Sequence, residues 1–122
     1  MLSFFKSSGP RVQSILPADA VARAARGEVT LIDVRDAVEL RSTGKAEGAL
    51  HLPLMLIATK ADPRHPEHLK AMATDKPIVL YCATGARSQM AGSMLLKLGY
   101  TQVFNLGGLG NWRAGGGAVV AA

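Results

Sequence analysis

The stretch VLYCATGARSQM, residues 79–90, holds the single cysteine of the chain, Cys82. Apolar residues lead into this cysteine, small residues follow it over 83–86, and a helix-like sequence begins near Arg87. This order predicts a buried strand, a tight turn and a helix. A cysteine at that point is either a buried packing residue or a nucleophile held among backbone N–H groups.

The predicted turn has the features of an anion site. The first turn of a helix carries N–H groups without helical partners and a partial positive charge. A thiol at that position is expected to have a lowered pKa, because the N–H groups, the helix dipole and Arg87 stabilise the thiolate. We therefore predict that Cys82 is a nucleophile. The residues predicted to bind its substrate are Ala83, Thr84, Gly85, Ala86, Arg87 and Ser88.

The rest of the chain alternates short apolar runs with helical patterns. Strands are expected at Val29–Val34 and within residues 48–54, 76–82 and 101–106, and helices at 17–26, 36–44 and 86–98 with a last short one near Trp112. Residues 55–74 are ambiguous: a helix begins, prolines interrupt it, and a second helix is possible from His68. Spacing on the helix of residues 86–98 predicts Met90 and Met94 in the core. This alternation predicts an α/β fold with a parallel sheet covered by helices on both faces.

Length and composition fit one globular domain. The chain has 122 residues, of which 48% are hydrophobic and 19% charged, and it contains no apolar run near the roughly 20 residues that span a bilayer. The N-terminus lacks the apolar core of a secretory signal, and one cysteine cannot form an internal disulfide, so we expect a cytoplasmic protein. We divide the chain into a loose arm (1–10), the domain (11–114) and a flexible tail (115–122).

The net charge of +5 would suit an anionic partner. The basic residues are scattered, however, and few aromatic residues accompany them, which favours a solvated surface over a nucleic-acid patch. We expect neither a nucleic-acid partner nor a membrane partner.

Several segments together resemble the single-domain rhodanese family of sulfurtransferases. They are LIDVRDAVEL, GALHLP, IVLYCATGARS, MLLKLGY and VFNLGGLGNW, in this order between Leu16 and Trp112. The resemblance implies a five-stranded parallel sheet with helices on both sides. It also implies that Cys82 accepts a sulfane sulfur from a donor such as thiosulfate or a persulfide and passes it to cyanide, a thiol or a protein. No metal or organic cofactor is implied.

Two other functions stay open. Protein tyrosine phosphatases place five residues between their cysteine and arginine, whereas four separate Cys82 from Arg87. The shorter loop favours a sulfur anion over a phosphoryl group, although a small phosphatase or arsenate reductase remains an alternative. A non-catalytic binding module with this fold is the other alternative.

Some positions depart from the family pattern or allow two interpretations. Ala83 and Thr84 stand where many thiosulfate-using rhodaneses carry cations, and Lys45 and Glu47 replace a usual histidine and proline. Asp33 and Arg35 follow a strand at the carboxyl edge of the predicted sheet, where sites of α/β folds gather. We expect them to support the active-site loop, Asp33 by hydrogen bonding and Arg35 from nearby; a purely structural ion pair is the alternative. Glu39 is expected on a helix surface or as a structural partner.

Overall fold

A five-stranded parallel sheet forms the centre of the molecule. The computed structural model describes residues 10–122. The strands lie in the order β1-β6-β5-β2-β4, and each neighbouring pair runs parallel. Their bounds are β1 Gln13–Ser14, β2 Thr30–Asp33, β4 Leu50–His51, β5 Ile78–Cys82 and β6 Val103–Gly108. The sheet confirms the predicted fold class.

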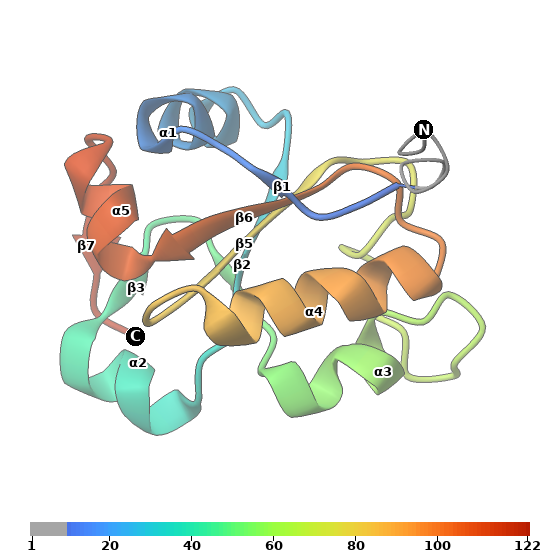
Figure 1. Cartoon of the computed structure of the whole chain (residues 1–122). Helices are drawn as coiled ribbons and strands as arrows, with labels where there is room; N and C mark the ends of the chain where they lie inside the picture. Colours follow the sequence, from blue (N-terminus) through green and yellow to red (C-terminus); the bar gives the residue numbers. More distant parts are fainter. Residues whose placement is uncertain (1–9) are drawn as a thin grey trace.

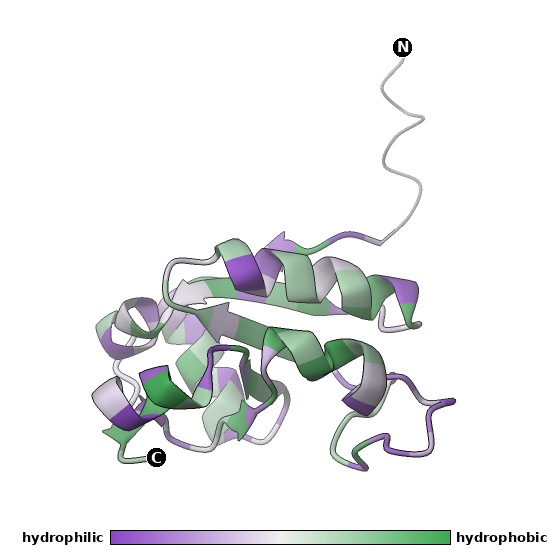
Figure 2. Ribbon diagram, turned by 90° about the horizontal axis from the view of Figure 1, so that it is seen from below, coloured by the Kyte–Doolittle hydropathy of each residue, from purple (hydrophilic) through white to green (hydrophobic). Residues whose placement is uncertain are grey.

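Helices cover both faces of this sheet (Figure 1), with α1 and α5 on one side and α3 and α4 on the other. A further helix, α2, lies at the end of the sheet beside the turn that begins α4 (Figure 1). The helices are α1 Pro17–Ala25, α2 Ala37–Thr43, the 3-10 turn η2 Leu54–Leu56, α3 Ile57–Lys60, α4 Ala86–Lys97 and α5 Leu109–Ala114. The strands are largely hydrophobic, whereas the loop after α3 is hydrophilic (Figure 2). None of the described helices is long and apolar enough to cross a membrane.

Alternation along β5 sends its side chains into two separate cores. Leu80 and Cys82 belong to the core under α3 and α4. Val79 and Tyr81 belong to the core under α1 and α5. Successive side chains of a strand point to opposite faces, so the register of β5 determines which helices surround the cysteine.

Local sequence explains where several helices begin and end. Pro17 occupies the start of α1, where its missing N–H costs nothing. Glu39 in the first turn of α2 accepts a hydrogen bond from the backbone N–H of Asp36 at 3.0 Å. Gly44 follows the last residue of α2 with φ +78°. The helices expected at 17–26 and 36–44 are confirmed.

Two expectations from the sequence are wrong. The second helix that seemed possible from His68 does not form, and residues 61–77 fold as turns and bends. Met90 is 59% exposed, because α4 turns Ser88, Ala91 and Leu95 toward the sheet instead. Met94 packs at the edge of the core as predicted.

The C-terminal segment of the predicted domain division pairs with a distant part of the domain. The predicted arm, residues 1–10, lies outside the described residues except for Pro10. Residues 115–122, predicted as a flexible tail, contain β7 (Val119–Val120), which pairs antiparallel with β3 (Lys45–Ala46). Trp112 Nε1 also donates a hydrogen bond to the carbonyl of Ala118 at 2.7 Å. This pairing joins segments far apart in sequence, so no local pattern indicated it, and the boundary after residue 114 stays a prediction.

Candidate active site

Cys82 is the last residue of β5 and is fully buried. The turn after it leads directly into α4, and Gly85 caps that helix with φ +107°, a conformation that side chains disfavour. The backbone N–H of Gly85 donates a hydrogen bond to Cys82 Sγ at 3.0 Å. Gly108 lets the turn approach β6, because a Cβ there would lie 2.2 Å from the carbonyl oxygen of Ala83. The predicted strand, turn and helix therefore do surround the sulfur.

Ser88 and Asn105 complete the surroundings of the sulfur. Ser88 Oγ lies 3.4 Å from Cys82 Sγ and donates a hydrogen bond to Asn105 Oδ1 at 2.7 Å. Asn105 comes from β6, and its Nδ2 donates to the carbonyl of Gly85 at 3.0 Å. The side chain of Asn105 thus connects the neighbouring strand to both the helix and the turn.

The hydrogen bonds around the thiol outweigh its burial. Burial of Cys82 acts to raise the pKa of its thiol. The Ser88 hydroxyl and the backbone N–H groups of Ser88, Gly85 and Thr84 act in the opposite direction, and the net pKa is lowered. A lowered pKa increases the thiolate fraction at neutral pH, which is the nucleophilic form.

Arg87 does not stand free beside the sulfur. Its Nη1 and Nη2 donate to Glu39 Oε1 at 2.6 Å and Oε2 at 2.8 Å, which ties α4 to α2. The hydrogen bonds from Arg87 lower the pKa of Glu39 to about 2. In return, the pKa of Arg87 is raised, first by the Glu39 hydrogen bond and with a smaller contribution from Cys82. The guanidinium therefore acts on the cysteine while its own charge is largely balanced.

Asp33 and Arg35 form a buried pair away from the sulfur. Arg35 Nη2 lies 2.7 Å from Asp33 Oδ2, and both side chains are at most 4% exposed. Asp33 is in register with Tyr81 of β5, and Tyr81 belongs to the core on the face opposite Cys82. Asp33 also accepts the backbone N–H of Arg35 at 2.9 Å. This geometry is that of a buried structural ion pair, and a supporting role of the two residues toward the active-site loop stays a prediction.

Arg35 also contacts the end of α2. Its Nη1 donates to Thr43 Oγ1 at 2.8 Å and its Nη2 to the carbonyl of Gly44 at 2.7 Å. Arg35 therefore holds the end of the helix whose first turn supplies Glu39. Arg35 is thus linked to the cysteine turn indirectly, through α2 and the contact of Glu39 with Arg87.

Asn105 was not identified from the sequence, and Glu39, expected on a helix surface or as a structural partner, had no partner assigned to it. A signal existed for each: Glu39 lies three residues after the helix cap Asp36, and Asn105 is a polar residue within the apolar run of β6. Neither signal names a partner. Arg87 is 48 positions from Glu39, and Ser88 is 17 positions from Asn105.

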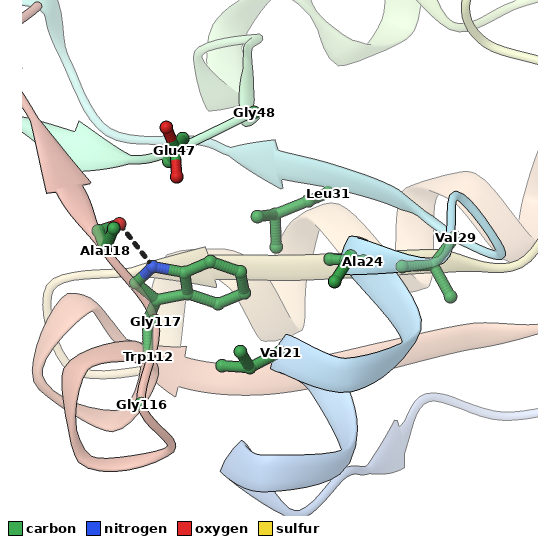
Figure 3. A pocket seen from close by; sticks show the side chains of 11 residues that line it. Val21, Ala24, Val29, Leu31, Glu47, Gly48, Trp112, Gly116, Gly117 and Ala118 are labelled. Atoms are coloured by element: carbon green, nitrogen blue, oxygen red, sulfur yellow. Dashed lines mark hydrogen bonds between the residues drawn. The ribbon is translucent and has the colours of Figure 1, made fainter.

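A separate hollow of about 400 Å³ lies on the opposite side of the sheet, between α1, α5 and the β3–β4 connection (Figure 3). Trp112 forms one wall, and Val21, Ala24 and Leu31 supply apolar surface. Glu47 is the one acidic residue in its lining. Within residues 10–122, no group of three or more histidine, cysteine or acidic side chains is placed to hold a metal ion.

Comparison with known proteins identifies the family. A family model described as rhodanese-like domain matches residues 16–115. The chain belongs to the rhodanese-like family. This rhodanese-like domain is 36% identical over 95 residues to a protein of Allochromatium vinosum named sulfurtransferase, covering 77% of this chain and 80% of that protein.

Solved structures give the same fold. A structure of a protein of unknown function from Rhodopseudomonas palustris, described as a possible tyrosine phosphatase, is 31% identical, with a TM-score of 0.80 and coverage of 89% of this chain and 85% of that one. The human single-domain sulfurtransferase TSTD1 is 26% identical, with a TM-score of 0.68 and coverage of 88% and 97%. The resemblance seen in the sequence is therefore confirmed, and the domain belongs to a group that includes sulfurtransferases.

Proposed function

We propose that this rhodanese-like domain is a sulfurtransferase whose Cys82 carries the transferred sulfur as a persulfide. The observation that supports this most directly is the position of Cys82 at the start of the six-residue turn between β5 and α4. Sγ there accepts a hydrogen bond from the Gly85 N–H and lies near the Ser88 hydroxyl. These donors suit a thiolate, and they equally suit the terminal sulfur of a persulfide, which also carries negative charge.

The reaction balances without an added oxidant or reductant. The Cys82 thiolate attacks the sulfane sulfur of a donor such as thiosulfate; a bond forms between the two sulfurs, and sulfite leaves with the electron pair of the broken bond. A thiolate or cyanide acceptor then attacks the outer sulfur of the persulfide. Cys82 leaves as a thiolate, which regenerates the starting state.

The loop favours sulfur transfer over phosphoryl transfer. Four residues separate Cys82 from Arg87, and Glu39 already occupies both terminal nitrogens of that arginine. A phosphoryl group would need the guanidinium for its oxygens. A single outer sulfur needs only the backbone N–H groups. We retain phosphatase chemistry and a non-catalytic binding role as outcomes of the test.

Ala83 and Thr84 leave the outer part of the turn without cations, and both residues are exposed. Thiosulfate is a dianion, so a turn without cations attracts it weakly. A persulfide donor with lower charge is therefore the preferred donor in this proposal, and the acceptor is a thiol, a protein or cyanide. The cytoplasmic location stays a prediction from the sequence.

Intact-mass analysis tests this proposal. The wild-type chain is incubated with thiosulfate and, separately, with a small-molecule persulfide, and the mass is measured before and after a thiol acceptor is added. We expect the mass of one sulfur atom to be gained on Cys82 and lost again to the acceptor. Cys82→Ser should show neither change while its circular dichroism spectrum matches that of the wild type.

Failure to load sulfur from either donor would overturn the sulfurtransferase proposal and favour the binding module. Hydrolysis of an aryl phosphate that disappears in Cys82→Ser would instead support the phosphatase. Sulfur transfer to cyanide by Cys82→Ser would remove Cys82 from the mechanism.

A further inference from the structure

The hydroxyl of Ser88 has one proton and three acceptors within reach. Asn105 Oδ1 lies 2.7 Å from Ser88 Oγ, the carbonyl of Gly85 lies at 3.2 Å, and Cys82 Sγ lies at 3.4 Å. One hydroxyl donates one strong hydrogen bond at a time. The shortest distance assigns the proton to Asn105 in this structure, so the sulfur and Asn105 compete for it.

The orientation of the Asn105 amide is fixed by groups other than Ser88. The backbone N–H of Gly107 donates to Oδ1 at 3.0 Å. The Nδ2 group donates to the carbonyl of Gly85 at 3.0 Å and to Gln89 Oε1 at 3.1 Å. Because both ends of the amide have partners of the right kind, the oxygen must be the atom that faces Ser88.

A bulge in β6 creates this arrangement. Leu80 is in register with Asn105, but Tyr81 is in register with Gly107, so Leu106 is an extra residue in β6. The bulge turns the Gly107 N–H back toward the Asn105 side chain. Oδ1 therefore keeps a hydrogen bond even when the Ser88 hydroxyl points elsewhere.

We infer that Asn105 is a positioning residue for the Ser88 hydroxyl. While Cys82 is uncharged, Asn105 Oδ1 accepts the hydrogen bond of that hydroxyl; when the sulfur carries charge, the hydroxyl donates to Cys82 Sγ instead. The inference rests on the proposed function, because the sulfur is charged at two moments of that reaction. It is a thiolate before it attacks the donor, and it becomes one again when the acceptor takes the outer sulfur. Rotation about the Ser88 Cβ–Oγ bond suffices for this change of acceptor, since Oγ already lies within hydrogen-bond reach of Cys82 Sγ.

Three substitutions separate this role from a merely structural one. Asn105→Ala removes the nearest competing acceptor, so the pKa of Cys82 should fall, because the hydroxyl then gives up only its longer contact with the Gly85 carbonyl when it turns to the thiolate. Asn105→Asp keeps an acceptor and strengthens it, so the pKa should rise. Both variants lose the same Nδ2 bond to Gly85, and loosening of the turn would therefore move them in the same direction.

A double-mutant cycle with Ser88→Ala tests whether Asn105 acts on the pKa of Cys82 through the Ser88 hydroxyl. Alone, Ser88→Ala should raise the pKa of Cys82 and slow release of the outer sulfur about tenfold, since a hydrogen bond to a charged group is lost. In the Ser88→Ala background, Asn105→Ala should no longer lower the pKa. The part of the Asn105→Asp effect that persists there measures direct repulsion by the new carboxylate. The charged groups near the sulfur, Arg87 and beyond it Glu39 and Asp36, are unchanged in all of these variants.

The measurement is titration of the Cys82 thiolate by its ultraviolet absorbance, with single-turnover release of sulfur from the loaded protein as the second readout. Gln89→Ala is the matched control, because it removes another partner of Asn105 Nδ2 and should leave the titration unchanged. A pKa that rises in Asn105→Ala, or that falls equally with and without Ser88, would overturn the inference. If the wild type never loads sulfur, the proposed function fails; if it loads sulfur but the cycle is additive, only the role of Asn105 fails.

Discussion

Two arginine–carboxylate pairs near the carboxyl ends of the strands are each held by two hydrogen bonds, but their surroundings differ. Arg35 contacts Asp33 through Nε at 3.0 Å and Nη2 at 2.7 Å, and Arg87 contacts Glu39 at 2.6 and 2.8 Å. The first pair is at most 4% exposed, whereas both side chains of the second are about one-third exposed. The partners of the first pair are two positions apart in the sequence and those of the second are 48 positions apart.

This difference in burial separates a brace from an adjustable part of the site. A buried charge that loses its partner is not solvated by water, so separating Asp33 from Arg35 strongly destabilises the fold. Arg87 and Glu39 can each be solvated when parted, so their separation costs little stability. The half-exposed pair is therefore the one whose change alters the field at Cys82 without unfolding the domain.

Breaking the buried pair should have the largest effect on stability. Arg35→Met keeps most of the apolar stem but leaves the Asp33 carboxylate buried without its cation. We expect a loss of about 3–5 kcal/mol in the free energy of unfolding, measured by urea denaturation. The double variant Asp33→Asn, Arg35→Met should recover part of that loss, because no unpaired charge remains. A double variant as unstable as the sum of its two single variants would show that the pair is not coupled in this way.

Removing the charge of Glu39 should have a smaller effect on stability and a clear effect on the cysteine. Glu39→Gln keeps the size of the side chain and an oxygen for the Asp36 N–H. We expect a loss of about 1 kcal/mol in the free energy of unfolding. Because the positive charge of Arg87 is no longer balanced, the pKa of Cys82 should fall further and the KM for thiosulfate should decrease more than that for a less charged persulfide.

Glu47→Gln is the matched control for that prediction. Glu47 is an exposed carboxylate beside the Trp112 hollow, on the side of the sheet opposite Cys82. Its substitution makes the same change in net charge and should leave the pKa of Cys82 unaltered. An equal shift in both variants would mean that net charge, and not the Arg87 contact, sets the field at the sulfur.

The two pairs also show why the sequence reveals some parts of this domain and not others. Cys82, its turn and the start of α4 are contiguous, so their geometry follows from local patterns of apolar and small residues. Asp33 and Arg35 were visible as candidates for the same reason, but the alternation of side chains places Asp33 beside Tyr81 and away from Cys82. Strand ends signal where a site gathers, and they do not show which face of the sheet each residue serves.

The unpredicted parts depend on contacts between distant segments. The partner of Arg87 comes from α2, and the partner of Ser88 comes from β6. Strand β1 has only two residues, which is too short for an alternation pattern, and β7 is defined by its pairing with β3. Such contacts follow from the packing of the whole fold, so a single sequence supplies the residues without their pairing.

Acid should break the Glu39–Arg87 ion pair over the pH range in which the Glu39 carboxylate is protonated. The pKa of Glu39 is about 2 in the folded protein against an ordinary value of 4.5, so the folded state binds this proton less readily than the unfolded chain. The stability that the pair contributes, about 1 kcal/mol for a half-exposed pair, is therefore fully present above pH about 4.5 and is lost as the pH falls toward about 2. We expect the difference in unfolding free energy between wild type and Glu39→Gln to be constant near neutral pH and to shrink over that acidic range. Arg87→Met, which removes the other partner, should remove most of the same pH-dependent part, and the backbone N–H of Asp36 supplies a smaller share. A pH-dependent part that persists unchanged in Arg87→Met would mean that Glu39 does not owe its low pKa to Arg87.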